Sequence, residues 1–264
     1  MECQPAKETI FKRKVSSQMF NEETKKLIIS CINKNPDYPE TFTQDDFIKL
    51  NICIFDEIDN QVVYRNKDYK SGPISSLLDF LINLKKFDSS LTRFFPYGLN
   101  LLATAALYNY PSIISILLKN KIFNIDSYSD EKTPLMWASS FGNLRVMRLL
   151  IKANANLNLQ NPDGNTALIL ASNFTPLYKD SKHAAALLIN AKANLDLTNK
   201  KGETALISAI KAEQFNTAKL LINSGARVNI ADGEGKTALD YAQEKNNKEL
   251  IDLLKSKGAK SGHA

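Results

Sequence analysis

The chain has 264 residues, a formal net charge of +6 and an ordinary apolar content of 44%. This length is long for one compact core but suits an array of repeats with a smaller flanking domain. The N-terminus lacks the apolar core of a secretion signal, and the chain has no apolar run near the ~20 residues that a membrane span needs, so we expect a cytoplasmic protein with no membrane segment.

The positive charge is unevenly distributed. Residues 1–97 carry 14 basic and 14 acidic side chains, whereas residues 98–264 carry 20 and 14. The basic residues are scattered among acidic ones, which is typical of a solvated surface. Three cysteines, Cys3, Cys31 and Cys53, are too far apart for a CxxC zinc site, and the residues after them are free of cysteine, which fits a reducing compartment. We therefore expect no metal site and no cofactor.

The first 97 residues show no repeat. Their apolar spacing predicts a helix from Asn21 to Lys34 and another that begins at Pro73. The second helix carries an amphipathic face over residues 74–82, which we expect to cover the first repeat. We interpret residues 1–97 as a mainly helical domain that either caps the repeats or recruits another protein.

From residue 98 onward, one short pattern recurs. Four threonines each precede a segment rich in leucine and alanine: Thr133, Thr166, Thr204 and Thr237. A degenerate copy of this motif occupies residues 100–105. The steps between them are 33, 38 and 33 residues, which indicates stacked units that cannot bury their apolar faces alone. The predicted units are 98–130, 131–163, 164–201, 202–234 and 235–260.

Each unit is expected to hold two helices. A glycine turn precedes three of the threonines, and the threonine suits a helix N-cap, with Pro134 at the first helical position. A leucine pair marks the second helix, and Asn154, Gly225 or Gly258 follows it in the left-handed conformation. Lys192 occupies that place in the third unit; because a lysine at positive φ is strained, we expect a different helix exit there.

These units resemble ankyrin repeats, whose pattern is T-P-L-H-x-A followed by a leucine pair and a glycine-alanine exit. The resemblance covers residues 98–260 and implies an all-α solenoid of about five units, each with two antiparallel helices and a projecting β-turn finger. It also implies recognition of a protein partner with no chemistry of its own. The motif histidine is absent; its places hold Ala103, Met136, Ile169, Ile207 and Asp240. We therefore expect apolar contact to replace the polar network that the family builds from that histidine.

The candidate partner-binding residues include an aromatic ladder. Tyr108, Phe141 and Phe174 share one repeat position, which the resemblance places on the accessible groove side. They are either interface anchors, in which aromatic residues are enriched, or rings packed against the local turns. On the finger side, the candidates are Tyr97, Leu99, Asp130 and Lys132, and in the insertion of the 38-residue unit the candidate is Tyr178. That insertion is either a contact loop or merely tolerated. Trp137, inside the motif helix, is expected to be buried.

Two other classes of function have weaker support in the sequence. Catalysis would need Cys31 or Cys53 beside His183, with no orienting partner evident, so we expect no catalytic residues. Nucleic-acid binding would need basic stripes near the rings, but Arg145, Arg148 and Lys152 fall on a second helix.

We expect a monomeric scaffold for a protein partner. The alternative is an adaptor whose N-terminal domain recruits a ubiquitin ligase or another enzyme. The richness in Asn, Lys and Ile suits an AT-rich genome, and the chain resembles effectors that intracellular bacterial pathogens export into host cells. Its partner would then be a host protein; otherwise it is a housekeeping adaptor.

Overall fold

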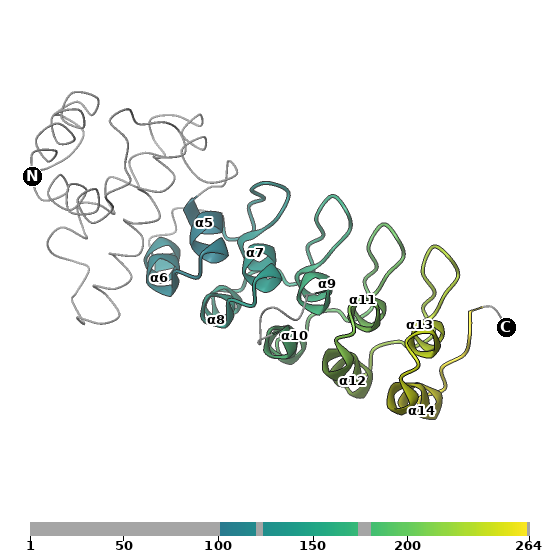
Figure 1. Cartoon of the computed structure of the whole chain (residues 1–264). Coiled ribbons are helices and arrows are strands. Elements are labelled where there is room, and N and C mark those ends of the chain that lie inside the picture. Colours follow the sequence, from purple (N-terminus) through teal and green to yellow (C-terminus); the bar gives the residue numbers. More distant parts are fainter. Residues whose placement is uncertain (1–100, 120–123, 174–180, 263–264) are drawn as a thin grey trace, which may run out of the picture. The chain divides into compact units, whose positions relative to one another are not determined.

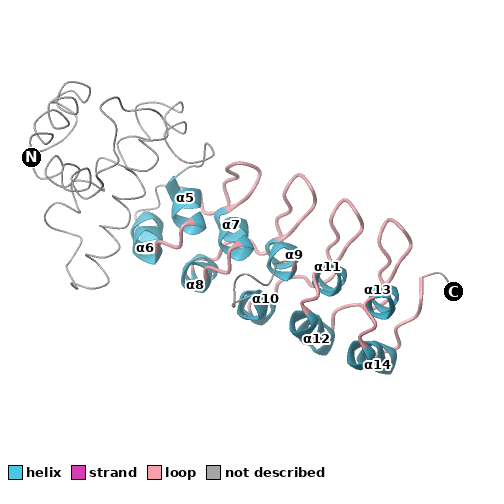
Figure 2. Cartoon of the chain, in the orientation of Figure 1, coloured by secondary structure: helices cyan, strands magenta, loops and turns pink. Residues whose placement is uncertain are grey.

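The computed structural model describes residues 101–119, 124–173 and 181–262 (Figure 1). The regular structure of these residues is helical (Figure 2), and they fall into two compact units. The first unit contains α5 (Leu101–Leu107) as far as Ala105, together with Tyr110 and α6 (Pro111–Lys119). The second contains Ala106–Asn109 and the described residues from 124 onward. The helices predicted within residues 1–97 lie outside the described part of the chain.

Four helix pairs make up residues 124–262. Their bounds are Pro134–Ser140 (α7) and Leu144–Lys152 (α8), Ala167–Ser172 (α9) and Ser181–Asn190 (α10), Ala205–Lys211 (α11) and Phe215–Asn223 (α12), and Ala238–Glu244 (α13) and Lys248–Ser256 (α14). The first helices contact one another in one row and the second helices in another, and a loop projects ahead of each first helix (Figure 1). The predicted all-α stack of two-helix units is confirmed.

Threonine side chains begin the first helices, as predicted. The hydroxyl oxygen of Thr133 accepts a hydrogen bond from the Met136 amide at 3.3 Å, and Thr166 and Thr204 accept equivalent bonds at 3.2 Å. Each bond satisfies one of the backbone donors left free at a helix start. Pro134 lies at the start of α7, where its missing amide hydrogen costs nothing. The cap therefore sets the same entry geometry in each of these units.

The exits of the second helices are uniform, and the expectation of a different exit at Lys192 is wrong. Lys192 has φ 68°, close to φ 62° at Asn154 and φ 91° at Gly225. The amide of Ala193 donates to the Leu188 carbonyl at 3.0 Å, as the amide of Ala155 does to the Leu150 carbonyl. The buried alanine after each of these three exits must dock at the same place in the stack, and this packing outweighs the strain of ~1–2 kcal/mol that a non-glycine residue incurs there.

The core runs continuously through the stack. In each unit it contains the motif leucine of the first helix and the second leucine of the pair in the second helix, which are Leu135 and Leu150, Leu168 and Leu188, Leu206 and Leu221, and Leu239 and Leu254. Small buried alanines such as Ala138 and Ala171 lie between them and let neighbouring helices approach closely. Stability is therefore shared between neighbouring units.

The positions of the absent histidine hold residues of two kinds. Met136, Ile169 and Ile207 are buried apolar residues at the histidine position, as expected, whereas Asp240 is a buried carboxylate. The expectation of purely apolar contact is thus wrong for the last unit.

A separate ladder of hydrogen bonds follows the extended segments between units. Asp126 accepts from the Asn156 amide at 2.9 Å, Asn158 from Asn194 at 2.8 Å, Asp196 from Arg227 at 2.8 Å and Asn229 from Lys260 at 2.8 Å. The recurring Asn and Asp residues of these segments carry the polar contact.

Candidate protein-binding site

The first described finger differs from the three that follow it. The amide of Ser129 donates to the Lys132 carbonyl at 2.9 Å, which closes a two-residue loop. Asp130 and Glu131 form the loop with φ 48° and 62°, the positive values that a type I′ turn needs. In the next finger, Asn161 instead closes a longer loop that has Gly164 at φ 80°. The first described finger therefore presents two exposed carboxylates, and Glu131 adopts a positive φ that is uncommon for glutamate.

Trp137 connects this finger to helix α7. Its indole Nε1 donates to the Ser129 carbonyl at 3.0 Å, and the ammonium of Lys132 lies 4.2 Å from the centre of its ring. The Trp137 side chain is only 7% exposed, so the predicted burial is confirmed. One turn further along α7, Phe141 stacks on Trp137 with ring centres 6.4 Å apart. Trp137 thus holds the finger and the end of the helix in one rigid surface.

Two large apolar side chains are exposed on this surface. Among the described residues, Phe141 is 37% exposed and Tyr128 is 48% exposed. The Tyr128 hydroxyl donates to the Gln160 carbonyl at 2.8 Å, which orients its ring along the row of fingers. We call the surface made by Tyr128, Asp130, Glu131 and Phe141 around Trp137 the Trp137 face. Rings held in this way lose little side-chain freedom on binding.

The predicted site residues are only partly placed by the structure. Lys132 and Phe141 contact the Trp137 ring, and Asp130 follows Ser129, whose carbonyl accepts from the Trp137 indole. Tyr108 is half-buried and lies just after α5. The end of α5 beside Tyr108 is connected to the residues after Phe141, because the Asn143 side-chain amide donates to the Ala106 and Leu107 carbonyls at 2.8 and 2.9 Å. The other candidates, Tyr97, Leu99, Phe174 and Tyr178, lie outside the described residues. The aromatic ladder as a binding site therefore stays a prediction.

Sequence reasoning missed Tyr128. A signal was present, because the corresponding places at the base of later fingers hold Gln160, Thr198 and Ala231. An aromatic ring at a position that is otherwise polar or small indicates a local role. The pairing of Ser129 with Lys132 could not be predicted, because the earlier pattern placed a glycine turn only before the later threonines.

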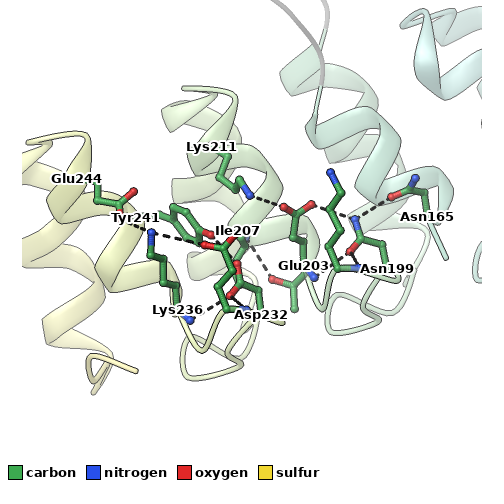
Figure 3. Close-up of polar contacts among 12 residues, drawn as sticks. Asn165, Asn199, Glu203, Ile207, Lys211, Asp232, Lys236, Tyr241 and Glu244 are labelled. Atoms are coloured by element: carbon green, nitrogen blue, oxygen red, sulfur yellow. Dashed lines mark hydrogen bonds and ion pairs between the residues drawn. The ribbon is translucent and has the colours of Figure 1, made fainter. Parts of the chain in front are cut away.

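A second polar cluster joins the last two units (Figure 3). The ammonium of Lys211 pairs with the Glu203 carboxylate at 2.5 Å and lies 4.9 Å from the centre of the Tyr241 ring. The Tyr241 hydroxyl donates to Asp232 at 2.5 Å, and Lys236 pairs with Glu244 at 2.8 Å. The charges in this cluster are matched by one another, so it ties two repeats together.

The pKa values in this cluster follow from burial and these pairs. Burial and the hydrogen bond to Asp232 raise the pKa of the Tyr241 phenol. Burial alone would raise the pKa of the Glu203 carboxyl, but hydrogen bonds from Lys211 and Asn199 outweigh it and leave the pKa below its ordinary value. Tyr241 therefore stays protonated and Glu203 stays ionised at neutral pH, which suits a structural contact.

The residues of the alternative functions are arranged differently. Cys31 and Cys53 lie outside the described part of the chain, and His183 is exposed on α10. Arg145, Arg148 and Lys152 are exposed on α8, in the row of second helices, whereas Phe141 follows α7. In residues 101–119, 124–173 and 181–262, no group of His, Cys, Asp and Glu side chains could hold a metal ion.

The stacked helix pairs with projecting fingers define a helical repeat protein. Comparison with protein families gives the class more closely: a family model of ankyrin repeats, written as three copies, matches residues 70–161, 102–180, 139–232 and 177–263. The chain belongs to the ankyrin-repeat family. No curated protein matches the chain. The first family match begins at residue 70, within the predicted N-terminal domain, so the boundary at residue 97 stays a prediction.

Ankyrin repeats are generally binding modules without catalysis, so a protein partner is implied for this chain. Among the helices that the structure describes, none is both long and apolar enough to pass through a bilayer.

Proposed function

We propose that this protein is a non-enzymatic scaffold that binds a partner protein through its fingers and first helices. The main supporting observation is the Trp137 face, which has two exposed rings: Phe141 stacks on the buried Trp137, and Tyr128 is held by its hydrogen bond to the Gln160 carbonyl. Aromatic residues are over-represented among the side chains that dominate binding energy in protein interfaces. A preformed surface of this kind favours docking with little change of backbone shape.

The contrast between the two helix rows supports this assignment. In the row of second helices, the exposed positions of α8 are charged: Arg145, Arg148 and Lys152. On the finger side, exposed aromatic area is concentrated at the end of α7 and in the finger before it. Because interface cores are depleted in charge and enriched in aromatic residues, the finger side is the better candidate.

The test is a photo-cross-linking residue at position 128, with partners identified by mass spectrometry. The double change Phe141→Ala with Phe174→Ala should abolish the main cross-linked product while far-ultraviolet circular dichroism stays unchanged. Arg148→Ala, on α8 in the row of second helices, serves as the matched control and should leave the cross-linked product intact. If the double change instead removes helicity, the rings belong to the core and the assignment fails.

We further propose that the partner is a host protein and that the chain acts in host cytoplasm as an exported effector, in line with its Asn-, Lys- and Ile-rich composition. A translocation reporter fused to the chain measures this directly. Delivery into host cytosol is the expected result, and its absence leaves the housekeeping adaptor.

A further inference from the structure

We propose that the Trp137 face binds a positively charged, apolar segment of its partner. This inference rests on the proposed function and adds the chemistry of the partner. It follows from two features that coincide on the first two described fingers, namely exposed rings and unpaired carboxylates.

The apolar part of the face is preorganised. The ring of Phe141 lies nearly parallel to that of Trp137, with an angle of 20° between them, and Tyr128 is held by its bond to the Gln160 carbonyl. Gln160 itself donates to the Gly164 carbonyl at 2.7 Å and to the Thr198 carbonyl at 2.8 Å, so the support for Tyr128 extends over the next two fingers. Both exposed rings can therefore receive an apolar anchor without first being ordered.

The charge on these fingers is opposite to that of the whole chain. Residues 127–133 and 159–165 contain the acids Asp130, Glu131 and Asp163 and the single cation Lys132. The three carboxylates are exposed and make no ion pair with any residue that the structure describes. The Lys132 ammonium lies against the Trp137 ring. A chain of net charge +6 thus carries a local acidic surface beside exposed rings.

Later fingers lack this combination. The third finger carries Lys200 and Lys201 at its tip, and the fourth carries Glu234 with Lys236, whose ammonium pairs with Glu244 and Glu234. Among the described residues, exposed large apolar side chains occur only at Tyr128 and Phe141. The rings and the unpaired acids therefore point to one binding position along the row, and not to a general property of the fingers.

Charge complementarity selects the kind of partner. A phosphate backbone would be repelled by Asp130, Glu131 and Asp163, and it needs a basic track to bind. A segment with Lys or Arg on either side of an apolar residue would place its cations near the carboxylates, or over the faces of the Tyr128 and Phe141 rings, where cations are attracted by the π electrons. The apolar residue would cover the rings themselves. The expected partner is therefore a basic, apolar stretch of polypeptide.

The test uses the full-length chain and short fluorescein-labelled peptides, with fluorescence anisotropy as the measurement. In the probe peptide, lysines flank a phenylalanine–leucine pair; in its counterpart, glutamates replace the lysines. We expect the lysine peptide to bind about tenfold more tightly than the glutamate peptide at low ionic strength, with the difference shrinking in high salt.

Two sets of variants locate the binding. The charge-removing pair Asp130→Asn with Glu131→Gln keeps side-chain size, and asparagine tolerates positive φ well, so the finger should stay folded. This pair should weaken the lysine peptide about tenfold and flatten its salt dependence, since each exposed charge contributes a few-fold at most. Phe141→Ala should weaken it about tenfold at every salt concentration. Glu234→Gln, on the fourth finger, removes an exposed charge and should change nothing.

Three outcomes would overturn the inference: equal binding of both peptides, binding of neither, or binding of the lysine peptide that none of the Trp137-face variants affects. These outcomes are distinct from failure of the proposed function. A cross-linked partner that depends on Phe141 would keep the scaffold proposal standing even when the lysine peptide does not bind.

Discussion

The carboxylate of Asp240 should lock residues 260–262 onto the last described repeat. Its Oδ2 accepts from the Gly262 amide at 2.8 Å and from the Thr237 amide at 2.7 Å, and its Oδ1 accepts from the Ser261 hydroxyl at 2.5 Å. The Thr237 hydroxyl lies 2.9 Å from the Lys260 carbonyl, to which it donates. Replacing Asp240 with alanine removes these acceptors together, while the backbone of α13 can remain helical.

The size of the effect follows from where the freed donors lie. The amide of Thr237 is a buried helix cap, whose loss costs ~1 kcal/mol. Ser261 and Gly262 lie nearer the surface, where water can replace the lost partner, so we assign each of these two hydrogen bonds ~1 kcal/mol, the typical net value for a hydrogen bond in a protein. We expect Asp240→Ala to destabilise the last unit by about 2–3 kcal/mol.

Hydrogen exchange measured by mass spectrometry is the suitable assay, because neighbouring repeats can open separately. Protection of amides in residues 229–262 should fall by a factor of about 30–150, which is the same free energy expressed as a ratio. Amides in α7 and α8 should keep their protection. Ser261→Ala is the milder control and should produce a smaller loss over the same residues.

The pH dependence supplies a second measurement of the same contact. Burial alone would raise the pKa of Asp240, but the hydrogen bonds from Ser261, Gly262 and Thr237 outweigh it and hold the pKa well below its ordinary value. A carboxyl whose pKa is lower in the folded state stabilises that state above the unfolded pKa, near 4, and loses this contribution as pH falls through the folded value. Wild type should therefore lose protection at residues 229–262 below about pH 4, whereas Asp240→Ala should show no such local step. Unchanged protection in the variant at neutral pH, or a loss spread evenly over the repeats, would refute this reasoning.

Two further changes test the backbone of the repeats. Lys192→Gly should raise the free energy of unfolding, measured by urea denaturation, by up to about 1 kcal/mol, because glycine adopts φ 68° without the strain of a side chain. The conformational freedom of glycine in the unfolded chain offsets part of this gain. A loss of stability would show that the lysine is not strained. Gly202→Ala should lower the free energy of unfolding by more than about 1 kcal/mol, because a Cβ at φ 75° would lie 2.7 Å from the Gly233 amide nitrogen. Gly225→Ala is its matched control: that glycine is also at positive φ but has nothing within 4 Å of its Cβ position, so equal losses would show that the finger contact contributes nothing.

The sequence by itself determined the repeat unit and its local geometry. The threonine caps, the turn glycines and the leucine pairs act within a few residues of one another, so their spacing is enough to predict the helices. It also predicted the burial of Trp137, because the residue lies inside the motif helix. These features are local, and the family match agrees with them.

Only the tertiary structure shows which backbone conformation, burial and hydrogen-bond partners the neighbouring units impose on each residue. Lys192 takes a strained conformation because the stack fixes where Ala193 must dock, and Asp240 is buried because residues 260–262 supply its hydrogen-bond donors. Trp137 connects the finger that carries Tyr128 to the helix end that carries Phe141, through its bond to the Ser129 carbonyl and its stacking on Phe141. Such contacts join residues brought together by folding, and no spacing along the chain specifies which donor meets which acceptor. The array could therefore be predicted from the sequence, whereas the exposed face needed the folded structure.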